Sequence, residues 1–196
     1  MEDPVVGGYT PDRIALRRAI NLAQDMDTEI RTIRRGQAIP AQSPVSPNLY
    51  GYDPAFKSEN STYDPARAKA LLDMYGYVDR DGDGWRDLPD GKPLVIVRST
   101  QPEQVNREFD TLWKKNLDAI GIKTTFNVGK WAEQLKSARA GKLQVWSLSS
   151  SAADPDGQGA FHRFHGPQAG SQNLARFRNA ELDAIYDRMQ SLPDGP

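Results

Sequence analysis

The strongest constraint on the fold is an alternation of short apolar runs with amphipathic segments along residues 93–149. Three runs rich in β-branched or apolar residues predict strands: PLVIVRS (93–99), IKTTFNV (122–128) and LQVWSLS (143–149). Apolar residues at helical spacing separate them, over 103–119 and 132–141. Strands that alternate with helices favour an α/β fold with a largely parallel sheet, in which ligands bind beyond the carboxyl ends of the strands.

Further helices are predicted from residues that begin or end them. Thr10-Pro11 begins the first helix, and Asp27 is expected to cap a second, short helix that ends at Gly36. Asp64-Pro65 begins a third helix. A last helix is expected over residues 180–190.

The longest predicted loop covers residues 38–54, with the sequence AIPAQSPVSPNLYGYDP. Its proline, serine and asparagine content favours an extended conformation over a helix or strand. A loop of this length inside a compact domain is usually functional or packed along the surface.

Composition excludes several classes of protein. Lysine plus arginine (25) nearly balance aspartate plus glutamate (26) in the 196 residues, which argues against a nucleic-acid binder, because such a protein presents a net basic face. The absence of cysteine excludes disulfides and cysteine-based zinc sites. No apolar run reaches the roughly 18 residues that a membrane-spanning helix needs. The length fits one domain or one lobe of a larger protein.

The sequence DRDGDGWRDLPD has the spacing of a calcium-binding loop. Alternate side chains converge on one centre in such a loop, and Gly84 permits the sharp turn. The last carboxylate belongs to aspartate, one methylene shorter than the usual glutamate, and a strand follows where a second helix is typical. The alternative is a glycine-aspartate turn with solvated carboxylates, balanced by Arg80 and Arg86. The predicted ligands are Asp79, Asp81, Asp83, the carbonyl of Trp85, Asp87 and Asp90.

Two patterns suggest catalysis, and both are incomplete. The segment FHRFHG places His162 and His165 three residues apart, and with Asp154 they form the ligand set of a hypothetical metallohydrolase. The glutamate base of zinc proteases is absent from this segment. The serines of residues 147–151 lack the flanking glycines of a nucleophile elbow, so we interpret them as hydroxyls that line a loop or pocket.

The tryptophans are expected to divide between the core and a cleft. Trp113 lies on an apolar helix face, and Trp146 lies within a strand, so both are assigned to the core. Trp131 begins a helix directly after a strand, which is a common place for a ring that faces a cleft.

Several segments in order resemble the family 5 extracellular solute-binding proteins of ABC transporters, the dipeptide and oligopeptide type. LRRAINLAQDMD (16–27) is similar to the start of their second lobe, with Arg17, Ala19, Ala23 and Asp25 at family positions. The aspartate loop also falls in family order. The other matching segments are GQAIPAQSPV (36–45), YDPARAKALLDMYGY (63–77), LKSARAGKLQVWSLS (135–149) and NLARFRNAELDAIYD (173–187).

The resemblance implies an α/β fold, one lobe of a type II periplasmic-binding-protein-like clamshell with a mixed sheet flanked by helices. Residues 1–196 are then a single ligand-binding lobe, the second of a two-lobed protein whose first lobe and signal peptide are absent. The implied function is non-enzymatic: it captures a peptide-like or other small solute between two lobes and delivers it to a membrane permease. The implied location is periplasmic or extracellular, with or without membrane association. No cofactor is required, and the aspartate loop is a candidate site for a structural calcium ion.

The resemblance also implies which residues face the ligand. Peptide-binding members usually carry a tryptophan where Ser150 stands, and Ala153 stands where they carry an aspartate that pairs with the free amine. A desolvated carboxylate holds an ammonium strongly, so its absence makes a simple peptide ligand less favoured unless Asp154 substitutes. The implied ligand-binding residues are Trp131, Ser147, Ser150, Asp154 and Asn173. Two alternatives remain open at this point, a calcium-stabilised interaction module and the metallohydrolase.

Overall fold

The computed structural model describes residues 2–149, 151–152 and 155–192 and confirms an α/β fold. Its sheet consists of β1 (Val95–Thr100), β2 (Lys123–Val128) and β3 (Val145–Trp146), in the order β2-β1-β3. All pairings in this described sheet are parallel, with Val95 opposite Lys123 and Arg98 opposite Val145. The third strand is much shorter than its apolar run predicted.

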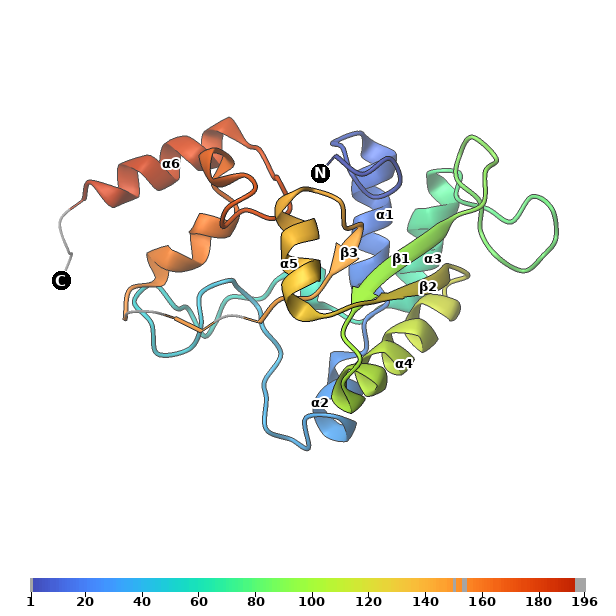
Figure 1. The fold of residues 1–196 in the computed structure, drawn as a ribbon, viewed down its shortest axis with the longest axis horizontal. Helices are drawn as coiled ribbons and strands as arrows, with labels where there is room; N and C mark the ends of the chain where they lie inside the picture. Colours follow the sequence, from blue (N-terminus) through green and yellow to red (C-terminus); the bar gives the residue numbers. More distant parts are fainter. Residues whose placement is uncertain (1, 150, 153–154, 193–196) are drawn as a thin grey trace.

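Helices cover the sheet and extend away from it (Figure 1). α1 and α3 pack together beside the sheet, α4 connects β1 to β2, and α6 lies at the opposite end of the molecule, away from the strands. No helix in the described part of the chain has both the length and the apolar character that crossing a membrane requires. The α-helices are α1 (Pro11–Leu22), α2 (Met26–Thr32), α3 (Pro65–Met74), α4 (Gln104–Asp118), α5 (Trp131–Arg139) and α6 (Ala180–Gln190). Short 3₁₀ helices cover Glu59–Ser61, Gly157–Arg163 and Gly166–Gln168.

The core forms where α1, α3, α4 and β1 meet. Leu16 of α1, Leu72 of α3, Ile96 of β1 and Leu117 of α4 are fully buried in one cluster. Each such side chain contributes about 1.5–3 kcal/mol through removal of its apolar surface from water. Trp113 joins this cluster, which confirms its assignment from the helical spacing.

The residue that caps α3 is the one predicted from the sequence, whereas the residue that caps α2 is a different one. Asp64 caps α3, because its carboxylate accepts a hydrogen bond from the N–H of Arg67 (2.8 Å). The prediction that Asp27 caps the second helix is wrong. Asp25 does so, accepting from the N–H of Thr28 at 2.9 Å and from its hydroxyl at 2.7 Å, while Asp27 lies in the first turn.

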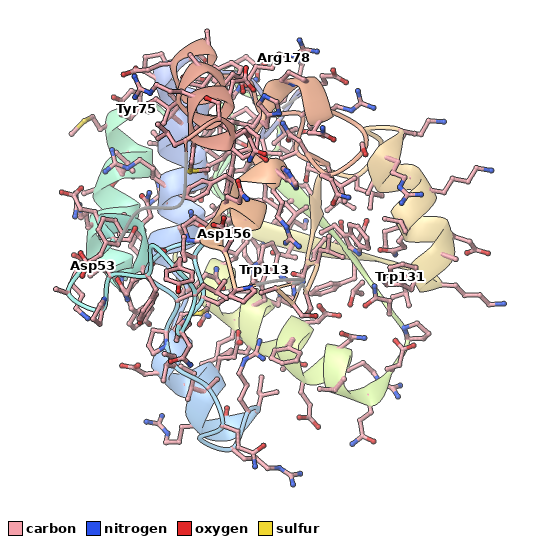
Figure 2. The ribbon with its side chains drawn as sticks, turned by 90° about the vertical axis from the view of Figure 1, so that its left-hand side faces the viewer. Asp53, Tyr75, Trp113, Trp131, Asp156 and Arg178 are labelled. Atoms are coloured by element: carbon pink, nitrogen blue, oxygen red, sulfur yellow. The ribbon has the colours of Figure 1, made fainter. Side chains whose placement is uncertain are left out.

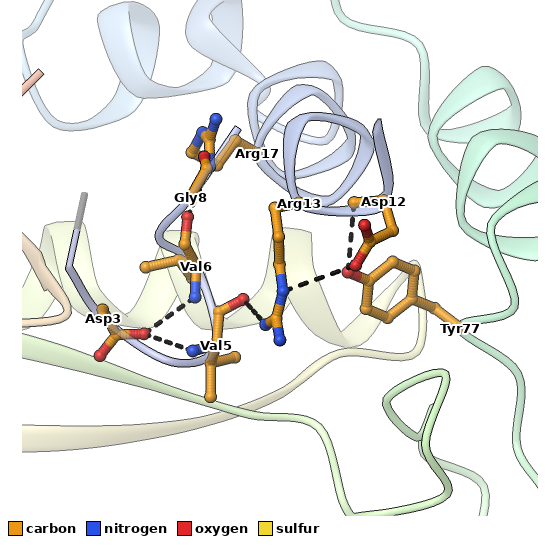
Figure 3. A network of polar contacts seen from close by, with 8 residues as sticks. All are labelled: Asp3, Val5, Val6, Gly8, Asp12, Arg13, Arg17 and Tyr77. Carbon is orange, nitrogen blue, oxygen red and sulfur yellow. Dashed lines mark hydrogen bonds and ion pairs between the residues drawn. The ribbon is translucent and has the colours of Figure 1, made fainter. Parts of the chain in front are cut away.

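A polar network fixes the chain before α1 (Figure 3). The Asp3 carboxylate accepts hydrogen bonds from the N–H groups of Val5 and Val6, both at 2.8 Å. Arg17 of α1 donates to the carbonyls of Val6 (2.7 Å) and Gly8 (2.9 Å). The first residues are therefore tied to the first turns of α1, instead of extending freely.

Tyr77 joins this network beside Asp12 and Arg13 of α1 (Figure 3). Its ring is fully buried, and its hydroxyl donates a hydrogen bond to the carbonyl of Asp12 (3.1 Å). Burial disfavours the charged phenolate and raises the pKa of Tyr77 to about 12, with the nearby Asp12 carboxylate adding to the effect.

The raised pKa predicts a loss of stability at high pH that depends on Tyr77. An ordinary tyrosine has a pKa of 10.0, so between pH 10.0 and about 12 the unfolded chain loses this proton while the folded chain keeps it. The free energy of unfolding should therefore fall with rising pH in that window, by at most about 1.4 kcal/mol per pH unit. Urea unfolding across this range measures the slope, and Tyr77→Phe should flatten it. Equal slopes in the two proteins would contradict the prediction.

Candidate functional site

A pocket of about 470 Å³ opens at the carboxyl edge of the sheet. We call it the strand-edge pocket. Ser99 and Thr100 end β1, Ser147 directly follows β3, and Trp131 begins α5 after β2, so three strand ends contribute to its lining. Parallel strands place their carboxyl ends at one edge, which is where loops converge on a ligand.

An ion pair stacked on an aromatic ring forms part of this pocket. Nε of Arg98 donates to Oδ1 of Asp110 at 2.9 Å, and the two side chains are only 12% and 11% exposed. The Arg98 guanidinium also lies 4.9 Å from the ring centroid of Trp113. A charge-assisted bond and a cation–π contact in a partly dry environment hold these side chains in one arrangement.

The same arrangement recurs at the rim of the pocket. Nε of Arg34 lies 2.7 Å from Oε1 of Glu29, and its guanidinium lies 5.0 Å from the centroid of Phe109. Among the described lining residues, Arg34, Glu29 and Arg98 are the charged ones, and each already has a partner. The other polar lining groups are neutral amides and hydroxyls. This surface can therefore stack on a ligand and exchange hydrogen bonds with it.

Trp131 is positioned by a neighbouring side chain that the sequence did not single out. Gln134, one turn further along α5, is buried, and its amide donates to the carbonyls of Thr100 (2.9 Å) and Asn127 (2.8 Å). These bonds tie the first turn of α5 to the ends of β1 and β2. Trp131 is 53% exposed and lies apart from the core in the side view (Figure 2). The Gln134 amide meets the two strand-end carbonyls only because of the strand register. No local sequence pattern predicts this contact.

The structure brings two of the predicted ligand residues together. Trp131 and Ser147 both line the strand-edge pocket. Ser150 and Asp154 lie outside the described residues. Trp146, assigned to the core, is half-buried.

Asn173 is not brought to the strand-edge pocket. Its side chain is fully buried, and its amide donates to the carbonyls of His165 (3.1 Å) and Phe177 (2.8 Å). Its oxygen accepts from the N–H of Phe177 (3.0 Å). In this structure the side chain of Asn173 orders its own loop.

The aspartate loop gathers three of its five carboxylates. The ligand atoms of Asp79, Asp81 and Asp87 lie within 4.8 Å of one another. Asp83 accepts instead from the N–H of Trp85 (2.8 Å), and Asp90 pairs with Lys92 at 2.7 Å, an interaction that lowers the pKa of the Asp90 carboxyl. The twelfth position therefore does not join the cluster that the calcium-loop spacing predicted.

Backbone donors already occupy part of this carboxylate cluster. The two oxygens of Asp79 accept from the N–H groups of Gly82 (2.7 Å) and Gly84 (2.9 Å). Both glycines have φ near +80°, at 79° and 88°, which the tight turn requires. The hydrogen bonds of a glycine-aspartate turn thus shape the loop.

The two histidines have different surroundings. His162 is exposed, whereas His165 is 8% exposed, with Nε2 3.1 Å from Oδ1 of Asp187 and its ring 4.7 Å from that of Tyr186. Within residues 2–149, 151–152 and 155–192, the aspartate cluster is the one group of three or more side chains close enough to hold a metal ion. The described residues therefore supply no third ligand beside the histidines, and the predicted partner Asp154 lies outside them.

A parallel sheet with a polar and aromatic pocket at its carboxyl edge is the arrangement in which α/β proteins typically bind ligands. The family model of bacterial extracellular solute-binding proteins, family 5 (middle region), matches residues 9–172, and the chain belongs to this family. This confirms the family resemblance of the ordered sequence segments. The family comprises bacterial extracellular solute-binding proteins, and solved structures with this fold include periplasmic binding proteins of ABC transporters.

Individual relatives agree with this assignment. Heme-binding protein A of Haemophilus influenzae is 29% identical over 184 residues, which are 90% of this chain and 30% of that protein. Di/tripeptide-binding protein 2 of Pseudomonas aeruginosa is 32% identical over 143 residues, which are 72% of this chain and 25% of the relative. The oligopeptide-binding protein AppA of Bacillus subtilis, solved with a nonapeptide, has the same fold, with a TM-score of 0.82 at 23% identity over 92% of this chain and 36% of its own.

The chain thus spans about a third or less of these relatives. They are binding proteins and not enzymes, which confirms the non-enzymatic assignment and argues against the metallohydrolase alternative.

The Arg98–Asp110 pair should contribute much more to stability than an exposed pair on the same helix. Asp110→Asn leaves a nearly buried guanidinium without its carboxylate and should lower the free energy of unfolding by about 2–4 kcal/mol. Asp118→Asn removes the more exposed Lys114–Asp118 pair of α4 and should cost less than about 1 kcal/mol. Urea unfolding of the two variants measures the difference. Similar losses would show that the first pair is no more desolvated than the second.

Proposed function

We propose that this chain is the ligand-binding lobe of the substrate-binding component of an ABC import system. The protein captures a peptide-like or other small solute between two lobes and delivers it to a membrane permease. The observation that carries this proposal is the strand-edge pocket, where Trp131 and Ser147 lie together at the carboxyl ends of parallel strands. Family membership over residues 9–172 supports it.

The chemistry of the pocket favours uncharged groups of a ligand. Trp131 offers an exposed indole face, and the serine, threonine and amide side chains offer hydrogen bonds. The arginines of the pocket are already paired with Glu29 and Asp110, so their charges are largely neutralised. Peptide bonds, which are planar, polar and uncharged, suit such a surface.

Residues 1–196 form one lobe in this proposal, and the other lobe covers the open side of the pocket. The protein acts on the periplasmic or extracellular side of the membrane, where family members function. Because the ligand contacts both lobes, one lobe alone supplies only part of the binding free energy. The isolated chain should bind solutes weakly, in the millimolar range.

Removing the indole of Trp131 should weaken ligand binding. Trialanine is a suitable probe, titrated into the isotope-labelled chain and followed by the indole N–H signals in NMR spectra. Trp131→Ala should raise the dissociation constant about two- to twelvefold, because aromatic stacking contributes about 0.5–1.5 kcal/mol. Trp85→Ala is the matched control, since Trp85 lies in the aspartate loop and does not line the pocket. Equal affinities of the Trp131 variant and the wild-type chain would exclude this pocket as the peptide site.

We also propose that calcium binds weakly to the aspartate loop as a structural ion. The clustering of Asp79, Asp81 and Asp87 supports this proposal, and the engagement of Asp90 by Lys92 argues for low affinity. With a dissociation constant of about 1 mM, about 10 mM calcium stabilises the fold by about 1.4 kcal/mol.

The expected rise in melting temperature is about 3–5 °C for a chain of this size. Asp79→Asn should abolish the rise, whereas Asp90→Asn should preserve it, because Asp90 lies outside the cluster. A melting temperature that calcium leaves unchanged would identify the loop as a solvated turn.

A further inference from the structure

A second pocket, of about 280 Å³, lies between loop residues 44–49 and the 3₁₀ helix Gly157–Arg163. We call it the loop pocket. Its walls are held together by the N–H of Tyr50, which donates to the carbonyl of Pro155 (2.9 Å). At Gly157 a Cβ atom would lie 2.4 Å from the carbonyl oxygen of Tyr50, so only glycine permits this close approach. The long proline-rich loop is therefore packed against the segment that follows β3.

Arg163 lines the loop pocket, and its guanidinium has no partner among the described residues. It is half-buried, and no hydrogen bond or ion pair of its side chain occurs in the described part of the chain. The other half-buried arginines of that part all donate to carboxylates or to backbone carbonyls. They are Arg13, Arg17, Arg86, Arg98 and Arg176.

The surroundings of Arg163 suit an anionic group. A guanidinium presents a planar set of donors that matches a carboxylate or a phosphate, and partial burial strengthens that attraction. The hydroxyls of Ser46 and Ser151 and the amide of Gln172 line the same pocket and add donors. Asp156 also lines it, but its carboxylate forms no ion pair with Arg163 and accepts instead from the N–H of Gln158 (2.9 Å).

The two pockets have lining residues that are near one another in the chain. Ser149 lines the strand-edge pocket and Ser151 lines the loop pocket. The Cα atoms of residues two apart in the chain are at most about 7 Å from one another. An elongated solute is therefore the class of ligand that we consider for both pockets.

We propose that the loop pocket is an anion subsite. In it Arg163 binds the carboxylate or phosphate group of an elongated solute, whose uncharged part lies on Trp131 in the strand-edge pocket. This inference rests on the proposed function in one respect. It assigns the anionic group and the uncharged group to a single transported solute. The anion site itself follows from the loop pocket and from a guanidinium that no described residue pairs with.

NMR titration of the isotope-labelled chain tests the subsite with simple probes. The Nε–H signal of Arg163 reports on the loop pocket, and the indole N–H of Trp131 reports on the strand-edge pocket. Acetate and inorganic phosphate, added at constant ionic strength, should each shift the Arg163 signal saturably. The anion with the lower dissociation constant is the preferred one. Trialanine should shift both reporters, whereas trialanine amide, which lacks the carboxylate, should shift only Trp131.

Arg163→Gln should weaken acetate and phosphate binding at least tenfold, as judged from the backbone signals of Gly159 and Gln172. Arg178→Gln is the matched control, because Arg178 is exposed and lines neither pocket (Figure 2). An Arg163 signal that no anion shifts in the wild-type chain overturns the subsite, whatever Trp131 does. If trialanine shifts Arg163 and leaves Trp131 unchanged, the proposed function fails and the anion subsite stands.

Discussion

The parallel pairing of β1 with both of its neighbours is the constraint on which the site depends. Because β2 and β3 run in the same direction as β1, the segments after all three strands emerge at one edge. Gln134 then bonds the ends of β1 and β2 together, which fixes the start of α5. The strand-edge pocket is a result of this topology, and an antiparallel arrangement would have scattered Trp131, Thr100 and Ser147 over two edges.

Charge pairing determines what each pocket offers to a solute. In the strand-edge pocket, Arg34 and Arg98 are each held by a carboxylate and an aromatic ring, so the surface is polar but electrically balanced. In the loop pocket, Arg163 keeps its charge uncompensated within the described part of the chain. The two pockets therefore differ in the electrostatic character of their lining.

The sequence predicted those features that depend on local patterns. Apolar periodicity located α4, α6 and the strands, and ordered motifs identified the family and, through it, Trp131 and Ser147. It could not predict features that depend on register or on long-range packing. The Arg98–Asp110 pair requires β1 and α4 to be placed in space, and the choice of Asp25 over Asp27 depends on where α2 begins. The burial of Asn173 arises from a loop that no periodicity describes.

The strand order has a consequence for the behaviour of this lobe in solution. β2 is an outer strand of the described sheet, and Val128 at its end is 59% exposed. An outer strand presents unpaired N–H and C=O groups to which a strand of another molecule can add. Lys123 is the first residue of this strand and Lys130 follows its end by two residues. Charges at these positions oppose such self-association. The topology that places a pocket at the carboxyl ends of the strands thus also leaves β2 as an outer strand of the described sheet, with a lysine near each of its ends.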